Sequence, residues 1–332
     1  MSQPEPAAAA QPELSAQPEL SELLAQWAPE PAEMTETMAA EPAVALAGVL
    51  DAEPPVARPG DAIPPLWHWL YFLDRPAQRD LGPDGHRAQG RFMPPIPRRR
   101  RMYAGGRVSY LSPVHCGEPI TRRSELARWS IRQGRSGELL FVTVRHTFLR
   151  DGVLVAAEEQ DLVYRSGPPP APADPVPGTA GPPAKAPDLG RGISMTTGAL
   201  AAAGTHARVT PVAESGGLWG LQAVADPVML FRFSALTYNA HRIHYDAQYA
   251  AAAEGHPGLV VHGPLIALLC LELPRRHRPD RRIAELSFRA RSPIYAGQVM
   301  TVTASQQDSG CAMRVTAPNG TDAMTAEGRF AP

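Results

Sequence analysis

The chain has 332 residues, which is enough for two ordinary domains that each bury a core. With 32 Lys and Arg residues against 33 Asp and Glu residues, its formal net charge is −1, which argues against bulk attraction to nucleic acid or to an anionic membrane. Its three cysteines form no CxxC pair, so neither a disulfide framework nor a zinc site is predicted.

The N-terminal 20 residues are rich in Ala, Pro, Glu and Gln, and we predict that residues 1–20 form a disordered tail. They lack the basic and then apolar regions of a signal peptide, and no apolar run approaches the ~20 residues of a membrane span. A cytoplasmic location without a membrane partner is therefore expected. Short helices are predicted after Ser21 and over residues 42–50, and the apolar run Pro64–Leu73 has the length of a further helix. Residues 74–97 are predicted to form a long ordered loop because Gly and Pro occur throughout.

Strand patterns follow between Gly106 and Arg165, separated by turns at Gly134–Gly137 and Asp151–Gly152, and they predict an antiparallel meander. Residues 166–189 are rich in Pro, Gly and Ala and are predicted to be a linker. The chain would then divide into a first domain and a second domain on either side of this linker, residues 21–165 and residues 190–332.

The second half repeats the plan of the first. Ser112–Thr121 (SPVHCGEPIT) aligns with Ser292–Thr301 (SPIYAGQVMT), and Ala43–Asp51 aligns with Met229–Thr237. The predicted helix at Trp67 likewise corresponds to an apolar helix after His262, and strands follow in both halves. An Asn319-Gly320 turn before the last strand is a hairpin signal. We therefore predict an α+β fold in which a bent antiparallel sheet wraps around a helix, twice.

Four of the ten histidines lie within residues 231–263, together with Asn239 and Asp246: His241, His244, His256 and His262. An imidazole, with an unperturbed pKa of ~6.5, can take or give a proton near neutrality, whereas an Asn side chain cannot titrate. The histidine spacings fit no common metal-ligand pattern, so no metal is predicted. Structural roles stay open for Asp246 as a helix cap or ion-pair partner, for His256 as a loop residue and for His262 as part of a turn.

Several phrases occur in the same order over most of the chain: LGPDGHRAQGRFMPPIPRRRRMYAGGRV, GRSGELLFVTVRH, EEQDLVYR, RFSALTYNAHRIHYD and HPGLVVHGPL. On these motifs the chain, from about Leu23 to its end, resembles the MaoC-like, R-specific enoyl-CoA hydratase family. The resemblance is to the branch with two hotdog domains, whose first half is a degenerate FAS1-like dehydratase domain. It implies a double hotdog fold in which the second half keeps the catalytic site.

In the wider family, the motif Ser-Gly-Asp-x-Asn-Pro-Ile-His supplies a catalytic Asp and a catalytic His. Here the matching stretch is Thr237–His244, so His244 matches the catalytic His and Asn239 stands where the Asp would be. The resemblance implies that His244 moves the proton and that Asn239 orients water or substrate, with His241 or Asp246 sharing the proton work. The backbone N–H of Gly263, which follows His262, would hold the thioester oxygen, because a helix N-terminus leaves amide groups free.

The resemblance also implies an activity. It predicts a hydro-lyase that adds water to an α,β-unsaturated acyl-CoA, or removes it, without a metal or redox cofactor. Mesaconyl-C4-CoA (3-methylfumaryl-CoA), going to citramalyl-CoA, is the favoured substrate. Two alternatives stay open, a 3-hydroxyacyl-thioester dehydratase of fatty-acid or polyketide type and a non-catalytic acyl-thioester-binding module.

The basic run Arg98–Arg101 is predicted to clamp the phosphates of CoA, since Arg binds phosphate through two parallel hydrogen bonds. A solvated loop is the alternative, and four other arginines are rival clamps: Arg275, Arg276, Arg281 and Arg282. Nucleic acid is not an expected partner, because aromatic residues are not interleaved with the charges. A homodimer stays open beside pairing of the two hotdogs within one chain.

Overall fold

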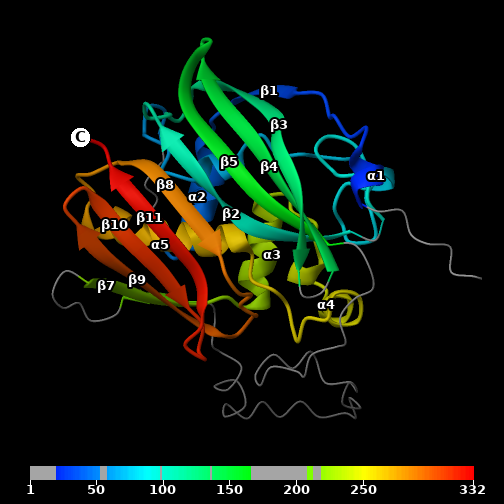
Figure 1. Ribbon diagram of the computed structural model, residues 1–332. Coiled ribbons are helices and arrows are strands. Elements are labelled where there is room, and N and C mark those ends of the chain that lie inside the picture. The colour runs from blue at the N-terminus through cyan, green and yellow to red at the C-terminus, as the bar shows by residue number, and fades with distance from the viewer. Residues whose placement is uncertain (1–19, 53–57, 98, 135–136, 166–207, 212–217) are drawn as a thin grey trace, which may run out of the picture.

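The computed structural model describes residues 20–52, 58–97, 99–134, 137–165, 208–211 and 218–332, and these form two halves that share one sheet (Figure 1). Within them, eleven strands form one antiparallel sheet in the order β1-β3-β4-β5-β2-β8-β11-β10-β9-β7-β6. The halves join where β2 pairs with β8, from Gly105 opposite Arg289 to Ser109 opposite Glu285. The predicted linker and nearly all of the predicted tail lie outside the described residues.

The first half contains α1 (Leu20–Leu24), β1 (Ala32–Thr37), α2 (Ala40–Val49), the 3-10 turns η1 (Trp67–Leu70) and η2 (Gln78–Asp80), β2 (Arg100–Tyr110), β3 (Pro119–Gly134), β4 (Gly137–Arg150) and β5 (Val153–Arg165). The second half contains β6 (Arg208–Pro211), β7 (Leu218–Val224), α3 (Pro227–Leu236), η3 (Arg242–His244), α4 (Ala247–Glu254), α5 (Gly263–His277), β8 (Ile283–Ala290), β9 (Val299–Gln307), β10 (Gly310–Thr316) and β11 (Asp322–Phe330). No helix of these described parts is long and apolar enough to cross a membrane.

The predicted meander is confirmed for β3, β4 and β5, which pair antiparallel in chain order, but it is wrong for β2, which pairs with β5 and β8 and not with β3. Residues 135–136 of the predicted Gly134–Gly137 turn lie outside the described residues, while the turn between β4 and β5 contains Asp151 and Gly152 with positive φ angles of 49° and 80°. The Asn319-Gly320 turn lies between β10 and β11, with Gly320 at φ 79°. These turns need the left-handed conformation that Gly and Asn tolerate best, which is why their positions could be read from the sequence.

The internal repeat is also confirmed. His115 in the first half bridges Ala62, and Tyr295, its counterpart in the second half, bridges Val260. The following residues repeat a hydrogen bond as well: a carboxylate oxygen of Glu118 accepts from the backbone N–H of His115 at 2.9 Å, and the amide oxygen of Gln298 accepts from that of Tyr295 at 3.0 Å. Counting from these bridges, Pro65 stands in the first half where Gly263 stands in the second. Pro has no backbone N–H, so the first half lacks the corresponding donor.

The prediction of a helix over Pro64–Leu73 is wrong, and only the four residues of η1 are helical there. Leu66 and Phe72, which flank η1, have positive φ angles of 67° and 57°, so the backbone cannot continue as an α-helix. Side-chain hydrogen bonds hold this shape, since the N–H of Leu66 donates to Tyr110 Oη at 2.7 Å and that of Phe72 donates to Glu36 at 2.6 Å. The long central helix is therefore found in the second half, where α5 packs against β7, β9, β10 and β11.

One hydrophobic core crosses both halves. It contains side chains of α2, α3 and α5 together with inward residues of both parts of the sheet. α2 and α3, whose sequences align as repeats, contact each other. The core therefore holds the halves together in addition to the β2–β8 ladder.

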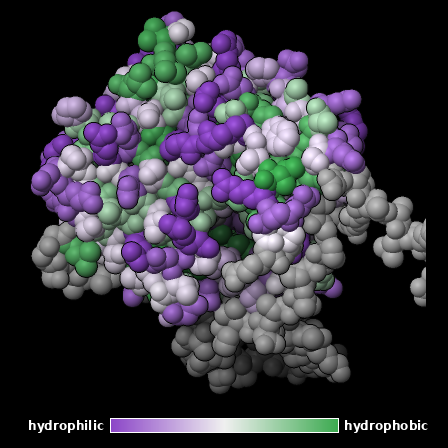
Figure 2. Space-filling model, in the orientation of Figure 1, coloured by the Kyte–Doolittle hydropathy of each residue, from purple (hydrophilic) through white to green (hydrophobic). Residues whose placement is uncertain are grey.

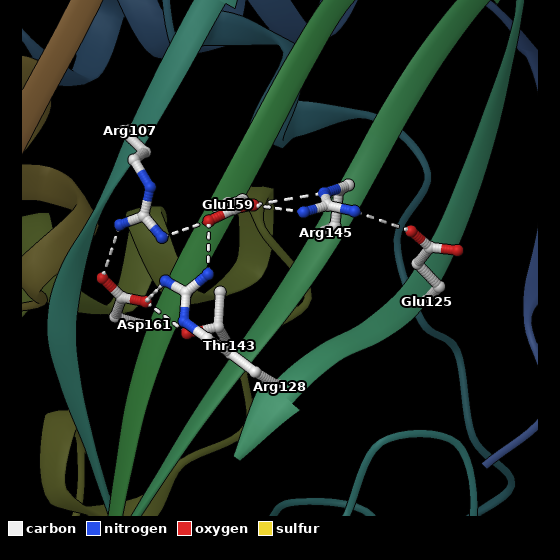
Figure 3. A network of polar contacts seen from close by, with 7 residues as sticks. All are labelled: Arg107, Glu125, Arg128, Thr143, Arg145, Glu159 and Asp161. Carbon is white, nitrogen blue, oxygen red and sulfur yellow. Dashed lines mark hydrogen bonds and ion pairs between the residues drawn. The ribbon is translucent and has the colours of Figure 1, made fainter. Parts of the chain in front are cut away.

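Alternation along β5 directs charges to both faces of the first-half sheet. Outward-facing Glu159 and Asp161 pair with Arg107, and Glu159 also pairs with Arg145 at 2.8 Å (Figure 3). Glu158, which immediately precedes Glu159 in the strand, is instead buried on the inner face. On the view in Figure 2, hydrophilic residues cover most of the surface, and hydrophobic residues gather at the top over the β4–β5 turn.

Candidate active site

A cavity of about 1250 Å³ lies between the inner face of the first-half sheet and the histidine-rich loops of the second half. Its lining includes candidate residues from the second half, Asn239, His241, His244, His256 and Gly263. Residues of the first half line it as well, among them Asp74, His86, Arg101, Tyr103 and Glu158. The predicted catalytic stretch therefore faces a space that both halves enclose.

His244 is held as a neutral base. Its Nδ1 lies 2.7 Å from the carbonyl oxygen of Val260, to which it can donate only when Nδ1 carries the proton. The lone pair then sits on Nε2. Burial, and after it the neighbouring His262 and His241, lower the pKa of His244 well below its ordinary value. The ring is therefore neutral at neutral pH, with Nε2 able to accept a proton.

The ring of His262 packs against that of His244, and His262 does not line the cavity. It precedes α5 as the N-cap residue, and its ring stacks on that of His244 with the centroids 3.6 Å apart. Its Nε2 lies 2.9 Å from Ser234 Oγ, while its buried Nδ1 has no hydrogen-bond partner among the described residues. Burial, then the charge of His241, lowers the pKa of His262 to about 3. The structure therefore places His262 in contact with His244 and outside the cavity that would hold the thioester.

His241 and Glu254 form a second buried pair beside His244. Nε2 of His241 lies 3.4 Å from Glu254 Oε1, and its ring is perpendicular to that of His244 with centroids 5.5 Å apart. Asn239 Oδ1 accepts a hydrogen bond of 3.1 Å from the backbone N–H of His241 and so shapes the loop that carries both histidines. Glu254 ends an Ala-rich helix, a position that the sequence reasoning did not single out.

The first half contributes Asp84 and His86, which the sequence analysis quoted only within a longer phrase. His86 Nδ1 lies 3.2 Å from Asp84 Oδ2, and the rings of His86 and His241 are 4.3 Å apart. Burial lowers the pKa of His86 to about 4. Burial raises the pKa of Asp84, but the hydrogen bonds and charge of His86, together with the charge of His241, outweigh it and lower that pKa to about 2. A long Gly- and Pro-rich loop was the available signal, since such loops are often functional.

The Asp84 loop is docked closely onto the His241 loop. The backbone N–H of Arg242 donates to Asp84 O at 2.9 Å. Gly85, at φ 87°, lies so close that a Cβ added there would stand 1.8 Å from Ala240 O. Only glycine fits this contact, which fixes His86 against His241.

Asp84, His86 and His241 also form the group that would hold a metal ion among the described residues, since one ligand atom from each lies within 4.8 Å of the others. One ring nitrogen of each histidine already has a carboxylate partner, since His86 Nδ1 bonds to Asp84 and His241 Nε2 to Glu254. A site that works without a metal stays a prediction.

Gly263 is the first residue of α5, so its N–H has no partner within the helix and lies at the positive end of the helix dipole. The Tyr103 ring, from β2 of the first half, covers it closely: a Cβ on Gly263 would lie 2.9 Å from Tyr103 Cδ1. The hydroxyl of Tyr103 is buried and has no hydrogen-bond partner among the described residues. This arrangement can hold a thioester oxygen between a backbone donor and an aromatic wall.

A second buried polar cluster lines the cavity in the first half. Glu158 accepts hydrogen bonds from His68 Nε2 at 2.9 Å, Trp69 Nε1 at 2.8 Å and Gln160 Nε2 at 2.8 Å. Burial raises the pKa of Glu158, but the hydrogen bond and charge of His68, together with His146 and Gln160, outweigh it and lower that pKa to about 2. Ser124 Oγ lies 2.8 Å from His146 Nδ1 in the same part of the cavity. This wall is polar, although it occupies the inner face of the sheet.

The structure does not place Asp246 in the site, and it places only part of the basic run Arg98–Arg101 there. Asp246 lies outside the cavity lining, where it caps α4 by accepting from the N–H of Tyr249 at 2.9 Å and pairs with Arg242 at 2.7 Å. In the basic run, Arg98 lies outside the described residues, and Arg99 donates to the carbonyl oxygen of Pro94 at 2.8 Å. Arg100 and Arg101 line the cavity. The rival arginines bond within their own surroundings: Arg275 and Arg276 to Glu272, Arg281 to Ala331 O and Arg282 to Tyr110 O.

The sequence profile of hydroxyacyl-thioester dehydratase type 2 matches residues 66–202 and 201–296 of this chain. Over 286 residues, the chain is 39% identical to the mesaconyl-C(4)-CoA hydratase of Chloroflexus aurantiacus, covering 86% of this chain and 90% of that protein.

Two solved structures share the fold. One is a MaoC-like dehydratase from Phytophthora capsici, with a TM-score of 0.57 and 13% identity over 94% of this chain and 98% of that one. The other is a conserved hypothetical protein from Mycobacterium tuberculosis with a double hotdog fold, with a TM-score of 0.54 and 14% identity over 94% of this chain and 97% of that one. The predicted double hotdog is thereby confirmed.

Proposed function

Since the chain belongs to the hydroxyacyl-thioester dehydratase type 2 family, we propose that it is a hydro-lyase that adds water to mesaconyl-C4-CoA and forms citramalyl-CoA. The observation that carries this proposal is the setting of His244. Its Nδ1 is tied to Val260 O at 2.7 Å, and its neutral ring faces a cavity that also contains the amino end of α5. A base and an oxyanion donor on one cavity are what the hydration of an enoyl thioester requires.

The thioester oxygen accepts a hydrogen bond from the N–H of Gly263, which stabilises the enolate as it forms. A water molecule held by Asn239 gives a proton to Nε2 of His244 while its oxygen bonds to the β-carbon. The electrons of the double bond move to the α-carbon and the thioester oxygen. His241, paired with Glu254, then protonates the α-carbon, and the proton on His244 passes back to this pair. The net reaction adds one water molecule. His241 shares the proton transfer with His244, a role for which Asp246 was the alternative.

Further features belong to the same proposal. The reaction uses no redox cofactor and no metal, and Arg100, which lines the cavity together with Arg101, is a candidate for contacts with the CoA phosphates. A fatty-acid type of 3-hydroxyacyl-thioester dehydratase is the alternative substrate class within the same chemistry.

The test is to mix the purified full-length protein with mesaconyl-C4-CoA and to follow the loss of enoyl-thioester absorbance and the mass of the product. We expect citramalyl-CoA from the wild type and a loss of kcat by at least about 10²–10⁴-fold in His244→Ala, the range that a general base supplies. His115→Ala is the control, because this histidine lies outside the cavity lining in the loop that repeats that of Tyr295. Activity of His244→Ala within a few-fold of wild type would refute the assignment.

A further inference from the structure

We propose that Arg101 and Tyr103, both on β2 of the first half, form the subsite that binds the free carboxylate of the acyl group. This inference rests on the proposed function. Mesaconyl-C4-CoA carries, on the same β-carbon that receives water, a methyl group and a carboxylate. A cavity that takes this substrate must hold a second anionic group beside the reacting double bond, and burying a carboxylate is costly unless a cation pairs with it.

The strand geometry places the two side chains together. Arg101 and Tyr103 are two positions apart on β2, and residues at this spacing share one face of a strand. Both line the cavity, as do their β5 neighbours in the ladder, Tyr164 opposite Arg101 and Leu162 opposite Tyr103. A cationic group and a phenol are therefore presented side by side on one wall.

This wall stands next to the reacting atoms. The Tyr103 ring lies against Gly263, where a Cβ would come within 2.9 Å of it, and Gly263 is the donor for the thioester oxygen. Only the carbons of the double bond separate the thioester carbonyl from the substrate's carboxylate, so the carboxylate must lie close to Tyr103. On the other side, His86 lines the same cavity as Arg101, and its ring is 4.3 Å from that of His241. The guanidinium therefore shares the cavity with the proton-transfer groups.

Both groups lack partners of their own. The buried Tyr103 hydroxyl has no hydrogen-bond partner, and the side chain of Arg101 makes no hydrogen bond or ion pair, among the residues that the structure describes. Arg99, two residues earlier, is by contrast tied to the carbonyl oxygens of Pro94 and Ala88. A guanidinium and a phenol that are both free inside a cavity match a carboxylate, which accepts several charge-assisted hydrogen bonds.

Comparison with crotonyl-CoA distinguishes carboxylate binding by Arg101 from CoA binding and from a general role in catalysis. Crotonyl-CoA has the same CoA as mesaconyl-C4-CoA, but its trans double bond carries an uncharged methyl group at the position of the carboxylate and hydrogen at the position of the methyl group. We expect Arg101→Met to lower kcat/KM for mesaconyl-C4-CoA by about 100-fold or more, because the substrate carboxylate would then be buried without its cation. The value of kcat/KM for crotonyl-CoA should stay within about threefold of wild type. Tyr103→Phe should lower the mesaconyl-C4-CoA value by about 10-fold with the same selectivity. Arg123→Met is the matched control, since Arg123 pairs with Glu33 on the outer surface at 2.9 Å.

Equal losses on both substrates would overturn the inference and assign Arg101 to the CoA phosphates or to catalysis in general. An unchanged preference for mesaconyl-C4-CoA in Arg101→Met would overturn it too. In both cases the wild type still hydrates mesaconyl-C4-CoA, so the proposed function stands. A wild type that hydrates neither substrate removes the function and the inference together. If Arg101→Met does not fold, Arg101→Lys, which keeps the charge but not the planar fork, is measured in its place and should show a smaller loss confined to mesaconyl-C4-CoA.

Discussion

The imidazole rings of His244 and His262 stack face to face, with centroids 3.6 Å apart and planes 19° from parallel. Two protonated rings at this spacing in a buried site would repel each other strongly. The stack therefore favours the neutral form of both histidines, which is the form in which His244 can act as a base.

The pH dependence of the reaction should report this stack. The pKa of His244 in the folded protein lies well below the ordinary value of ~6.5, so the basic form persists when the pH falls through that value. We expect kcat/KM for mesaconyl-C4-CoA to be flat around pH ~6.5 and to fall only at more acidic pH. His262→Asn removes the neighbouring imidazole and should move the acidic limb upward. A wild-type limb centred at or above ~6.5 would contradict the prediction.

Gly85 and Gly90 make a matched pair for testing the docking of the first-half loop. Both have positive φ angles, of 87° and 84°, but a Cβ at Gly85 would meet Ala240 O at 1.8 Å while one at Gly90 would meet nothing within 4 Å. Both Ala variants carry the backbone strain of about 1–2 kcal/mol, and Gly85→Ala must also push the loops apart. We expect Gly85→Ala to lose at least about 10-fold in kcat, because misplacing a catalytic group costs rate steeply, while Gly90→Ala stays near wild type. Similar activities in the two variants would argue against the docked loop.

Glu254 should act through His241. Glu254→Gln keeps the size of the side chain but removes its charge, so the imidazole that it faces at 3.4 Å loses the carboxylate with which it can share the transferred proton. We expect kcat to fall by about 10–100-fold with KM nearly unchanged, since the pair contributes to proton transfer and not to binding. Glu285→Gln, which loses an exposed ion pair with Arg329, is the control. An unchanged kcat, or a loss seen only in KM, would remove Glu254 from the proton path.

Chelation tests the cluster of Asp84, His86 and His241. The proposed chemistry needs proton transfer and a backbone donor only, so we expect dialysis against EDTA to leave kcat unchanged and elemental analysis to find no bound divalent metal. Loss of activity on dialysis, with recovery on adding one divalent cation, would instead make these residues a metal site.

The polar wall around Glu158 should limit the acyl chain. Each methylene group that must lie against Glu158 and His68, instead of an apolar wall, forgoes about 0.8 kcal/mol, roughly fourfold in affinity. We expect kcat/KM for trans-2-enoyl-CoA substrates to fall steadily from crotonyl-CoA to octenoyl-CoA. A value that rises with chain length would favour the fatty-acid type of dehydratase.

Much of the fold could be predicted because its signals are local. Alternating strands, Gly-containing turns and the repeated SPxxxG segment each depend on residues close in sequence. The helix prediction at Pro64–Leu73 is wrong because the shape of this segment depends on distant contacts. His68 and Trp69 hydrogen-bond to Glu158, about 90 positions later, and no local sequence pattern predicts that contact.

The candidate site divides in the same way. His244, His241, Asn239 and Gly263 lie within one short window, so the sequence brought them together. Tyr103 and His86 reach the site through the pairing of β2 with β8 and through the close approach at Gly85, and neither relationship leaves a periodic trace in the sequence. The stacking of His262 on His244 depends on the angle at which α5 begins, which composition does not specify.

The β2–β8 ladder also affects how the protein behaves on dilution. Where two separate subunits must associate to enclose a site, lowering the protein concentration dissociates them, and the activity per subunit declines. Here the first-half wall and the second-half base belong to one covalent chain and one hydrogen-bonded sheet. Their local concentration with respect to each other is fixed, so this pairing persists at nanomolar protein as it does at micromolar protein.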